Sequence, residues 1–326
     1  MTDVLIAGAG LIGSSIAWRL SQAGASVTLC DAGTLGGETS SAGAGMLSPG
    51  GEFDKPSVWI DLAVEGMRMY PAFVEELASE TGVPIDFQIC GCHHFVGSET
   101  AQRRAAFQSS KSIRVEITDR GLFYPGDAFV DPTDMLRALR SASKADLREH
   151  RAISEIESGE YGAVVLAAGA WSSQIRVTYR SRLVPLPSVK PIKGHLIGFQ
   201  LEPGSLGPML RRGHTYVLQR SSGFTIAGSN EEDAGFDRSV DPATCEEIHR
   251  GAAQLFPVLE RATPCRRWIG HRPFSPDGPH IRNVEGTNVW LAYGHFRNGI
   301  LLTPLTAQRI ANGISGFFAS AQSRER

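Results

Sequence analysis

Three glycines near the start of the chain have a spacing that suits phosphate binding. Residues 3–13 consist of an apolar run that ends in Gly-x-Gly-x-x-Gly. A helix is predicted directly after it, over Ser14 to Gln22. Gly8 permits the tight turn, Gly10 lets the backbone approach a pyrophosphate, and Gly13 lets the helix pack closely on the strand. The free N–H groups and the dipole at the helix start stabilise negative charge. This pattern indicates a site for the phosphates of a dinucleotide.

An acidic residue completes the pattern. A second apolar run, Val27 to Cys30, ends on Asp31. A carboxylate at this strand end accepts hydrogen bonds from ribose hydroxyls and disfavours a 2′-phosphate. The alternative, a glycine-rich turn in some other α/β protein, is weaker because strand, helix, second strand and acid are all in place. Only one such unit is present, so a second dinucleotide such as NADPH has no evident site, and electrons would come directly from a small substrate.

Two arginines stand where an anionic substrate could bind. Arg272 lies in Trp268-Ile-Gly-His-Arg-Pro273, and Arg297 lies in a glycine turn over residues 294–299. A guanidinium group matches a carboxylate with two parallel hydrogen bonds. An ordinary surface arginine is the alternative for each, and the flanking Trp, Gly and Pro residues disfavour it.

Other side chains that could do chemistry give weaker signals. His214 and Tyr216 are predicted to share one face of a strand, where they line a pocket or simply pack. The run Cys90-Gly-Cys92-His93-His94 lacks the usual zinc spacing, and its side chains would alternate between the two faces of a strand. We therefore expect no metal site. No Ser-His-Asp order or nucleophile elbow supports hydrolysis.

The elements that must position these residues are connected by glycine-rich segments. The loop at residues 36–46 is so rich in small residues that we expect close approach of another group to its backbone, with a flexible linker as the alternative. A buried strand is predicted within Gly162 to Trp171. Strand, glycine turn and helix are predicted again over Val289 to Leu302 and Thr303 to Ile314. A covering helix is predicted over Val58 to Thr81.

Short β-rich runs lie between these segments, at Leu196 to Leu201, Thr215 to Gln219 and Phe224 to Ala227, and predict an antiparallel sheet. The expected fold class is mixed α/β (α+β). A Rossmann-type dinucleotide-binding domain would be assembled from both chain ends, over residues 1–60, 130–180 and 265–326. A substrate-binding domain with the antiparallel sheet would be inserted over residues 61–129 and 181–264.

The composition excludes several function classes. With 32 Lys and Arg against 34 Asp and Glu, the net charge of -2 provides no field to gather nucleic acid or an anionic membrane. No apolar run approaches the roughly 20 residues of a membrane span, and the N-terminus lacks a basic signal region. We expect a cytoplasmic protein. Its five scattered Cys residues are expected to be reduced thiols.

Taken together, these landmarks resemble the D-amino-acid oxidase superfamily, and within it the glycine oxidases, over nearly the whole chain. The motifs that carry the resemblance are the N-terminal glycine unit, Thr39-Ser40 through Leu47, Val165 to Trp171, Pro191-Ile-Lys-Gly194, Trp268 to Pro273, Pro276-Asp-Gly278 and Gly294-His-Phe-Arg-Asn-Gly-Ile-Leu-Leu-Thr-Pro304. The last of these is the most specific.

The resemblance implies which residues form the site. FAD is expected to be bound without a covalent link, because the C-terminal glycine turn has no Cys. Arg272 would bind the substrate carboxylate, with Arg297 nearby and His214 and Tyr216 lining the pocket. FAD contacts would come from Gly8, Gly10, Leu11, Ile12, Gly13, Asp31, Ala32, Thr39, Ser40, Ala44, Gly45, Met46, Ile153, Gly169, His295, Phe296, Arg297, Asn298, Gly299, Ile300 and Leu301.

The activity that the resemblance implies is oxidative deamination of glycine or a similar small amino acid. Hydride transfer to flavin would give an imine, which water converts to glyoxylate and ammonia, and O2 would yield H2O2. The product would supply thiazole synthesis for thiamine, with thiazole synthase as a partner, and a homo-oligomer is expected. The alternatives are a D-amino-acid oxidase or dehydrogenase, a sarcosine oxidase, and, from other classes, a non-catalytic flavin-binding regulatory protein or an FAD-dependent domain that acts on tRNA.

Some positions depart from the family pattern. Glu231 lies near where relatives carry an apolar pocket residue, and a carboxylate there would repel acidic side chains and attract an amine. His195 and His271 also replace residues that are common in the family. The segment from Ala138 to Gly162 is short, so fewer strands are expected to cover the adenine.

Overall fold

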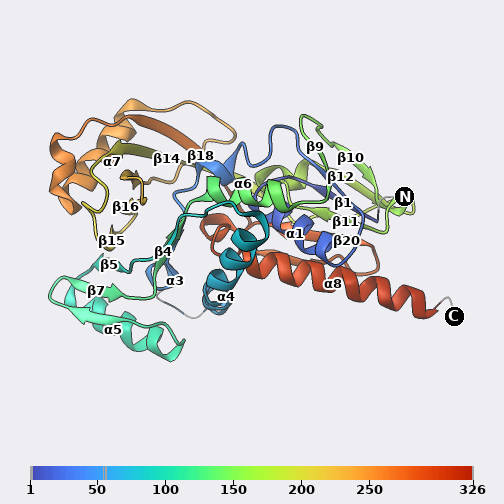
Figure 1. The fold of residues 1–326 in the computed structure, drawn as a ribbon, viewed down its shortest axis with the longest axis horizontal. Helices are drawn as coiled ribbons and strands as arrows, with labels where there is room; N and C mark the ends of the chain where they lie inside the picture. Colours follow the sequence, from blue (N-terminus) through green and yellow to red (C-terminus); the bar gives the residue numbers. More distant parts are fainter. Residues whose placement is uncertain (1–2, 54, 56, 325–326) are drawn as a thin grey trace.

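In a computed structural model, which describes residues 3–53, 55 and 57–324, the chain builds two large β-sheets with helices between and around them (Figure 1). The six-stranded sheet has the order β19-β20-β11-β1-β2-β9, and the eight-stranded sheet has the order β18-β14-β17-β16-β15-β5-β7-β6. The predicted mixed α/β class is confirmed. Residues 1, 2, 54, 56, 325 and 326, which fall within the predicted domain ranges, lie outside the described residues.

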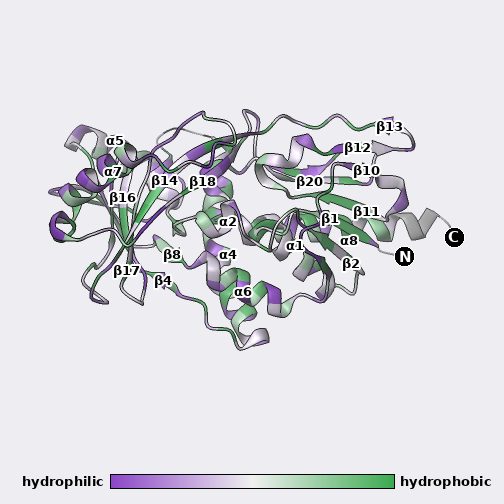
Figure 2. Ribbon diagram, turned by 90° about the horizontal axis from the view of Figure 1, so that it is seen from above, coloured by the Kyte–Doolittle hydropathy of each residue, from purple (hydrophilic) through white to green (hydrophobic). Residues whose placement is uncertain are grey.

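The six-stranded sheet combines segments from both ends of the chain. Its strands are β1 (Val4–Ala7), β2 (Val27–Cys30), β9 (Asp146–Arg148), β11 (Ala163–Leu166), β20 (Val289–Tyr293) and β19 (His280–Asn283). All pair in parallel except β19, which is antiparallel to β20. Every residue of β1, β2, β11 and β20 is buried, as expected of parallel strands covered on both faces, and these strands are hydrophobic in Figure 2.

Two helices cover one face of this sheet. Helix α1 (Leu11–Gln22) and helix α8 (Thr303–Arg324) share a hydrophobic core with the strands, to which α1 contributes Ile16 and Leu20, and α8 contributes Ile310. Helix α1 begins three residues before the predicted Ser14, because the chain turns helical directly after Gly10, whose carbonyl accepts from the Ser14 N–H. Helix α8 runs past the predicted end at Ile314.

The eight-stranded sheet lies at the other end of the molecule (Figure 1). Its strands are β18 (Arg266–Phe274), β14 (Lys190–Gln200), β17 (Phe224–Gly228), β16 (Thr215–Gln219), β15 (Met209–Arg212), β5 (Cys92–Phe95), β7 (Gly121–Tyr124) and β6 (Glu116–Thr118). Neighbours are antiparallel except β15 and β5, which are parallel. The predicted antiparallel strands between residues 196 and 227 are therefore confirmed. The division into two domains with the predicted boundaries stays a prediction.

The remaining elements connect and cover the two sheets. They are α2 (Thr39–Ala42), β3 (Met46–Leu47), α3 (Pro49–Glu52), α4 (Val58–Thr81), β4 (Phe87–Ile89), α5 (Ser98–Ser110), β8 (Ala128–Val130), α6 (Pro132–Ala142), β10 (Glu155–Glu157), β12 (Arg176–Tyr179), β13 (Arg182–Leu183), α7 (Pro242–Leu255) and the 3-10 turns η1 (Ser158–Glu160), η2 (Gly169–Gln174), η3 (Pro257–Arg261) and η4 (Phe296–Asn298). Helix α4 has the predicted bounds.

The segment with clustered Cys and His residues is part of the eight-stranded sheet. Cys92 and His94 point into the protein and are buried, whereas His93 stacks on Phe123. Among the described residues, no group of three or more His, Cys, Asp or Glu side chains is placed to hold a metal. None of the described helices is long and apolar enough to cross a membrane.

The packing of α8 on the sheet gives a stability prediction. Ile310 is buried in the core that α8 shares with α1 and the strands. We expect Ile310→Ala to lower the free energy of unfolding by about 2–5 kcal/mol, because it removes buried methyl groups and leaves a cavity. Ser315→Ala, at an exposed position of the same helix, is the control. Urea unfolding followed by circular dichroism measures both, and equal stability of the two variants would contradict the prediction.

Candidate functional site

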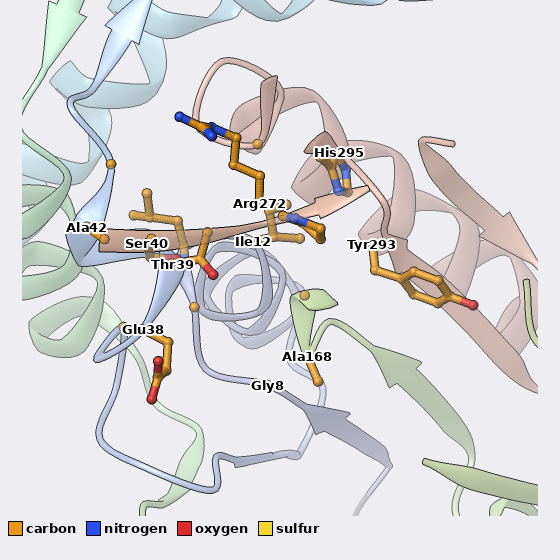
Figure 3. A pocket seen from close by; sticks show the side chains of 18 of the residues that line it. Gly8, Ile12, Glu38, Thr39, Ser40, Ala42, Ala168, Arg272, Tyr293 and His295 are labelled. Atoms are coloured by element: carbon orange, nitrogen blue, oxygen red, sulfur yellow. The ribbon is translucent and has the colours of Figure 1, made fainter. Parts of the chain in front are cut away.

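A cavity of about 620 Å³ lies between the two sheets (Figure 3). Residues at the carboxyl ends of four parallel strands line it: Gly8 after β1, Asp31 after β2, Ala167 after β11 and His295 after β20. Residues of β14, β16 and β18 in the other sheet line it as well. Carboxyl ends of parallel strands meet at one sheet edge, where α/β proteins bind nucleotides. The fold therefore brings both chain ends and the antiparallel sheet to one cavity.

The glycines of the N-terminal unit are required by close packing of the chain on itself. A Cβ at Gly8, where φ is +108°, would lie 2.5 Å from the Ala167 carbonyl carbon. At Gly13 it would lie 1.9 Å from the Gly8 oxygen, so the helix sits directly on the turn. At Gly10 it would lie 2.8 Å from the Ser40 hydroxyl. Larger residues at these positions would push the start of α1 away from the cavity.

The Asp31 carboxylate joins two loops of the cavity wall. It accepts hydrogen bonds from the Ala9 N–H at 2.7 Å and from the Gly33 N–H at 2.8 Å. A carboxylate has about four acceptor positions, so capacity for further donors is left. Asp31 thus both fixes the glycine turn and faces the cavity as an acceptor.

The predicted small-residue loop contains the short helix α2, and distant residues fix it in place. The Thr39 hydroxyl donates to the His271 carbonyl at 2.7 Å, and the Trp268 indole N–H donates to the Ala42 carbonyl at 2.9 Å. The buried Arg220 donates to the Ala44 carbonyl at 2.5 Å. The flexible-linker interpretation is wrong, because side chains 176–232 residues away in sequence hold this segment against the eight-stranded sheet.

The turn after β20 forms another wall and is likewise held from a distance. The Tyr70 hydroxyl on α4 donates to the Ile300 carbonyl at 2.6 Å, and burial raises the pKa of this phenol. No sequence motif pointed to Tyr70, whose role depends on how α4 packs across the turn.

His295 leaves a polar atom unsatisfied in the cavity wall. Its Nε2 lies 3.0 Å from the Thr306 hydroxyl, whereas its buried Nδ1 has no hydrogen-bond partner among the described residues. Burial lowers the pKa of His295 to about 3, so the imidazole is neutral in the folded protein. A buried nitrogen without a partner is costly, so this imidazole is a polar group of the wall that the described residues leave unsatisfied.

Arg272 lines the cavity and is held by neutral groups. Its guanidinium donates to the Asn230 carbonyl at 3.1 Å and to the Ser229 hydroxyl at 2.8 Å. It makes none of the ion pairs found among the described residues, and burial lowers its pKa. Gly194 provides the space, because a Cβ there would lie 2.2 Å from Arg272 Nη1. The glycine of the Pro-x-Lys-Gly motif is thus explained by the arginine on the adjacent strand.

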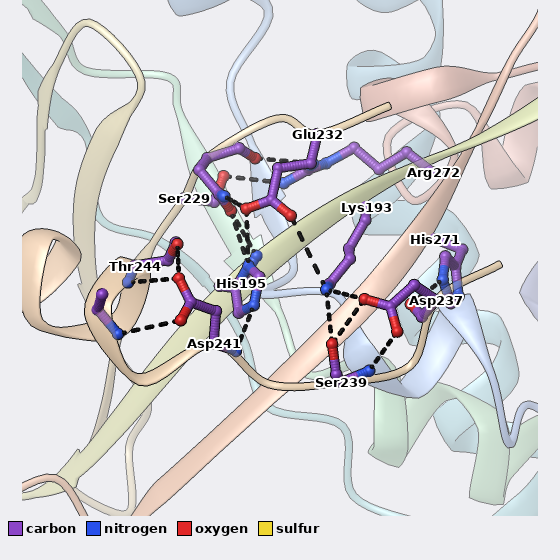
Figure 4. Close-up of polar contacts among 12 residues, drawn as sticks. Lys193, His195, Ser229, Glu232, Asp237, Ser239, Asp241, Thr244, His271 and Arg272 are labelled. Atoms are coloured by element: carbon purple, nitrogen blue, oxygen red, sulfur yellow. Dashed lines mark hydrogen bonds and ion pairs between the residues drawn. The ribbon is translucent and has the colours of Figure 1, made fainter. Parts of the chain in front are cut away.

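A buried polar cluster supports the residues that hold Arg272 (Figure 4). The His195 N–H donates to the Asn230 side-chain oxygen at 2.7 Å, and His195 Nε2 accepts from the Asp241 N–H at 3.0 Å. Lys193, also buried, exchanges two backbone hydrogen bonds with Glu232 and pairs with Asp237 at 2.6 Å. The histidine that departs from the family pattern at position 195 therefore positions the segment that binds Arg272.

The second arginine, Arg297, is paired with acids. It lies 2.6 Å from Glu231 and 3.2 Å from Glu52, and Glu52 also lies 2.7 Å from Arg211. Burial by itself raises the pKa of Glu52, but the charges of Arg211 and Arg297 outweigh it and hold this pKa below its usual value. Glu52 and Arg211 were not singled out from the sequence, because only the tertiary structure brings them to Arg297.

Every site residue predicted from the sequence lines the cavity except Gly13 and His214. Gly13 packs on Gly8, as described above. The prediction that His214 and Tyr216 share one strand face is wrong, because β16 begins at Thr215 and His214 lies in the turn before it. The side chain of His214 is 69% exposed and accepts from Arg297 at 3.2 Å. Contacts of these residues with cofactor or substrate stay a prediction.

Comparison with known proteins agrees with this architecture. The family model of the FAD dependent oxidoreductases (DAO) matches residues 3–312. The chain belongs to this family. It is 30% identical to the glycine oxidase of Pseudomonas putida, over 96% of this chain and 94% of that protein. The crystal structure of glycine oxidase from Geobacillus kaustophilus has a TM-score of 0.87 and 29% identity, covering 96% of this chain and 94% of that one. The resemblance to glycine oxidases is confirmed.

Another protein similar to this chain is about twice as long. The bifunctional protein ThiO/ThiG of Synechocystis sp. is 30% identical over 95% of this chain, which covers 51% of that protein.

The residues of the cavity fit FAD, the cofactor that the family uses. The start of α1, with its glycine turn and helix dipole, suits the pyrophosphate, and Asp31 suits a ribose. His295 lines the same cavity as Arg272, and its buried Nδ1 has no hydrogen-bond partner among the described residues. In this family the cofactor supplies two-electron oxidation, and the chain supplies its orientation and the substrate-binding groups.

The neutral His295 gives a pH prediction. Because the folded pKa is about 3 and the unfolded value is about 6.5, the unfolded state binds more protons between these limits. The contribution of His295 to the free energy of unfolding is therefore fully present above about pH 6.5. It falls as the pH falls, by up to about 1.4 kcal/mol per pH unit. We expect His295→Asn to flatten this dependence, measured by urea unfolding of the holoprotein between about pH 7 and 4.

Comparing the wild type with His295→Asn separates the effect of His295 from that of other titrating groups. His94, whose pKa burial lowers to about 4, contributes to the same pH window in both proteins. Circular dichroism at pH 8 checks that the variant is folded. An identical slope for wild type and variant would contradict the prediction.

Proposed function

We propose that this chain oxidises glycine or a similarly small amino acid to its imine, with FAD as the electron acceptor. The observation that carries the proposal is the Arg272 guanidinium, which lines the cavity and has neutral oxygen partners. A substrate carboxylate would supply the missing negative charge through two parallel hydrogen bonds. The glycine oxidases of P. putida and G. kaustophilus, similar over nearly their full lengths, support this substrate class.

The reaction needs orientation more than a strong base. The α-carbon loses hydrogen with both electrons of the C–H bond, the amine lone pair forms the C=N bond, and the amine releases a proton. Bound FAD would supply the acceptor for this hydride and would reduce O2 to H2O2 with the two electrons. Arg272 fixes the carboxylate and thereby the direction of the α-carbon hydrogen. Such positioning contributes up to about 7–11 kcal/mol to barrier lowering in favourable cases.

Tyr216 and Ser229 line the cavity together with Arg272. Tyr216 is buried beside Ser229, and burial raises the pKa of its phenol, which therefore stays protonated at neutral pH.

After release, the imine reacts with water to give a 2-oxo acid, which is glyoxylate in the case of glycine, and ammonia.

Anaerobic titration of the holoprotein with glycine, sarcosine and D-alanine tests the function. We expect loss of the oxidised flavin absorbance with at least one of them, and the order of their limiting reduction rates identifies the preferred substrate. A D-amino-acid oxidase would favour D-alanine, and a sarcosine oxidase would favour sarcosine. An oxidised spectrum that persists with all three would support a non-catalytic flavin-binding protein and contradict the proposal.

Two substitutions test the role of the carboxylate site. Arg272→Ala removes the cation, and Gly194→Ala displaces it, because the added methyl group would lie 2.2 Å from Arg272 Nη1. We expect both to raise the substrate KM by about 30-fold or more while flavin content stays unchanged. Steady-state kinetics and the flavin-to-protein absorbance ratio measure the two effects.

Matched controls separate substrate binding from structure. Arg267→Ala removes an exposed cation from the same strand, and Gly207→Ala adds a methyl group where no atom lies within 4 Å. Both controls should keep the wild-type KM. Parallel loss of FAD and activity in Arg272→Ala would show that Arg272 is structural.

The relative named ThiO/ThiG supports a proposed use for the product. In that protein a chain like this one is joined to a second part of similar length. We propose that the imine or glyoxylate is consumed by a thiazole synthase, as in thiamine biosynthesis. Non-covalent FAD and a homo-oligomer stay predictions, and acid precipitation that leaves yellow flavin in the supernatant tests the first.

A further inference from the structure

Arg297 is a second guanidinium in the cavity wall, and it is already paired with acids. Its Nη1 donates to Glu231 at 2.6 Å, and its Nε lies 3.2 Å from Glu52. Its side chain is 16% exposed, so these ion pairs are partly shielded from water. Partly buried pairs are screened less than surface pairs, and a new anion would have to displace an existing carboxylate.

One short segment holds both arginines. Ser229 and Asn230 accept hydrogen bonds from Arg272, and the next residue, Glu231, accepts from Arg297. The buried His195 fixes this segment through the Asn230 side chain. The Glu231 side chain is 31% exposed, and its bond to Arg297 gives it a defined partner at the edge of the site. It is set against Arg297 by the same backbone that positions the substrate-binding arginine.

The charges in this part of the site leave one cation without an acid. Arg211, Arg272 and Arg297 contribute +3, and Glu52 and Glu231 contribute −2, so the net charge is +1. The uncompensated charge is that of Arg272, because the ion pairs involve the other two arginines. The nearby Asp127 hydrogen-bonds the Ser48 hydroxyl, burial raises its pKa to about 7, and it makes no ion pair among the described residues.

We propose that Glu231 is a specificity-determining residue that restricts this enzyme to amino acids with a single carboxylate by neutralising Arg297. The proposal rests on the proposed function. A monocarboxylate matches the guanidinium of Arg272, which makes no ion pair among the described residues. A second carboxylate would have to approach Arg297, which also lines the cavity and whose charge Glu231 and Glu52 already balance.

The same geometry argues against the alternative that Glu231 binds a substrate amine. The Glu231 carboxylate accepts from Arg297 at 2.6 Å, and Glu231 is not among the residues that line the cavity. Arg297, with which this carboxylate pairs, does line the cavity. Glu231 thus acts on the substrate through the charge of Arg297.

Sarcosine and iminodiacetate test the proposal, because they differ only in a carboxylate on the N-methyl group. The wild-type enzyme should have a much higher kcat/KM for sarcosine than for iminodiacetate. We expect Glu231→Gln to lower the sarcosine-to-iminodiacetate ratio of kcat/KM by about tenfold or more, because it removes one of the two carboxylates that pair with Arg297 and leaves that guanidinium only partly neutralised by Glu52. An unchanged ratio would overturn the proposal.

Asp233→Asn is the matched control. It removes the same charge two residues away, from an exposed carboxylate that pairs with Lys190. This variant should keep the wild-type ratio, and a drop equal to that of Glu231→Gln would assign the effect to overall charge and overturn the proposal. Glu231→Met, apolar and of similar length, replaces Glu231→Gln if the latter does not fold, and the same result is expected of it.

A binding measurement keeps the proposal testable without turnover. Acetate and malonate are not oxidised, and their binding beside the cofactor changes the flavin spectrum. The wild-type holoprotein should bind acetate more tightly than malonate, and Glu231→Gln should reverse or narrow this difference. Tighter malonate binding by the wild type would overturn the proposal. If no amino acid reduces the flavin, the proposed function fails, whereas the acetate and malonate constants still decide the charge of the pocket.

Discussion

The guanidinium of Arg272 is held inside the protein by neutral oxygens, and much of the site is arranged around that charge. Burial of a cation without an acid partner is unfavourable, so the surrounding groups must supply hydrogen bonds and exclude competing packing. Ser229 and Asn230 supply the bonds, and Gly194 supplies the space. Lys193 and His195, themselves buried, hold the segment that carries Ser229 and Asn230. These neutral partners leave the charge of Arg272 available for an anion, which is how such a site differs from a structural ion pair.

Arg297 differs from Arg272 in its partners, because it is paired with carboxylates. Both arginines are cations at the same cavity, yet one is paired with two carboxylates and the other with none. The protein therefore provides one attractive position for a carboxylate, and the position of the substrate follows from charge as well as from shape. The family defines FAD-dependent oxidation, and this difference in charge between two neighbouring arginines selects the substrate.

The cofactor half of the cavity depends on close approach of backbone to backbone. Gly8 lies against the end of β11, and Gly13 lies against Gly8, so the start of α1 has one position relative to the sheet. Helix α8, from the other chain end, packs against α1 and the same strands. Both ends of the chain must dock before the cavity exists, which ties the stability of the fold to the integrity of the site.

The sequence by itself determined the features that depend on local backbone and periodicity. The strand, glycine turn, helix and acid of the first 31 residues, the helix at Val58–Thr81 and the antiparallel strands follow from residue type and spacing. The motifs around Arg272 and Arg297 could likewise be found, because glycines and prolines flank them. The start of α1, the helix α2 and the placement of His214 outside its strand were not predicted. The helix α2 is held by His271 and Trp268 of the distant strand β18, which no local pattern reveals.

Only the tertiary structure decided which charges meet. Glu52, Arg211 and Glu231 are separated from Arg297 by 66 to 245 residues, and no spacing rule relates them. The supports Tyr70, His195 and Arg220 are also distant in sequence from the segments that they hold, by 230, 35 and 176 residues. Hydrogen-bond and ion-pair partners in a folded chain are chosen by how sheets and helices pack, whereas sequence patterns report on neighbours within one element. The sequence thus predicted a dinucleotide cofactor and a carboxylate ligand, and the packing decided that Arg297 is paired with acids while Arg272 is held by neutral oxygens.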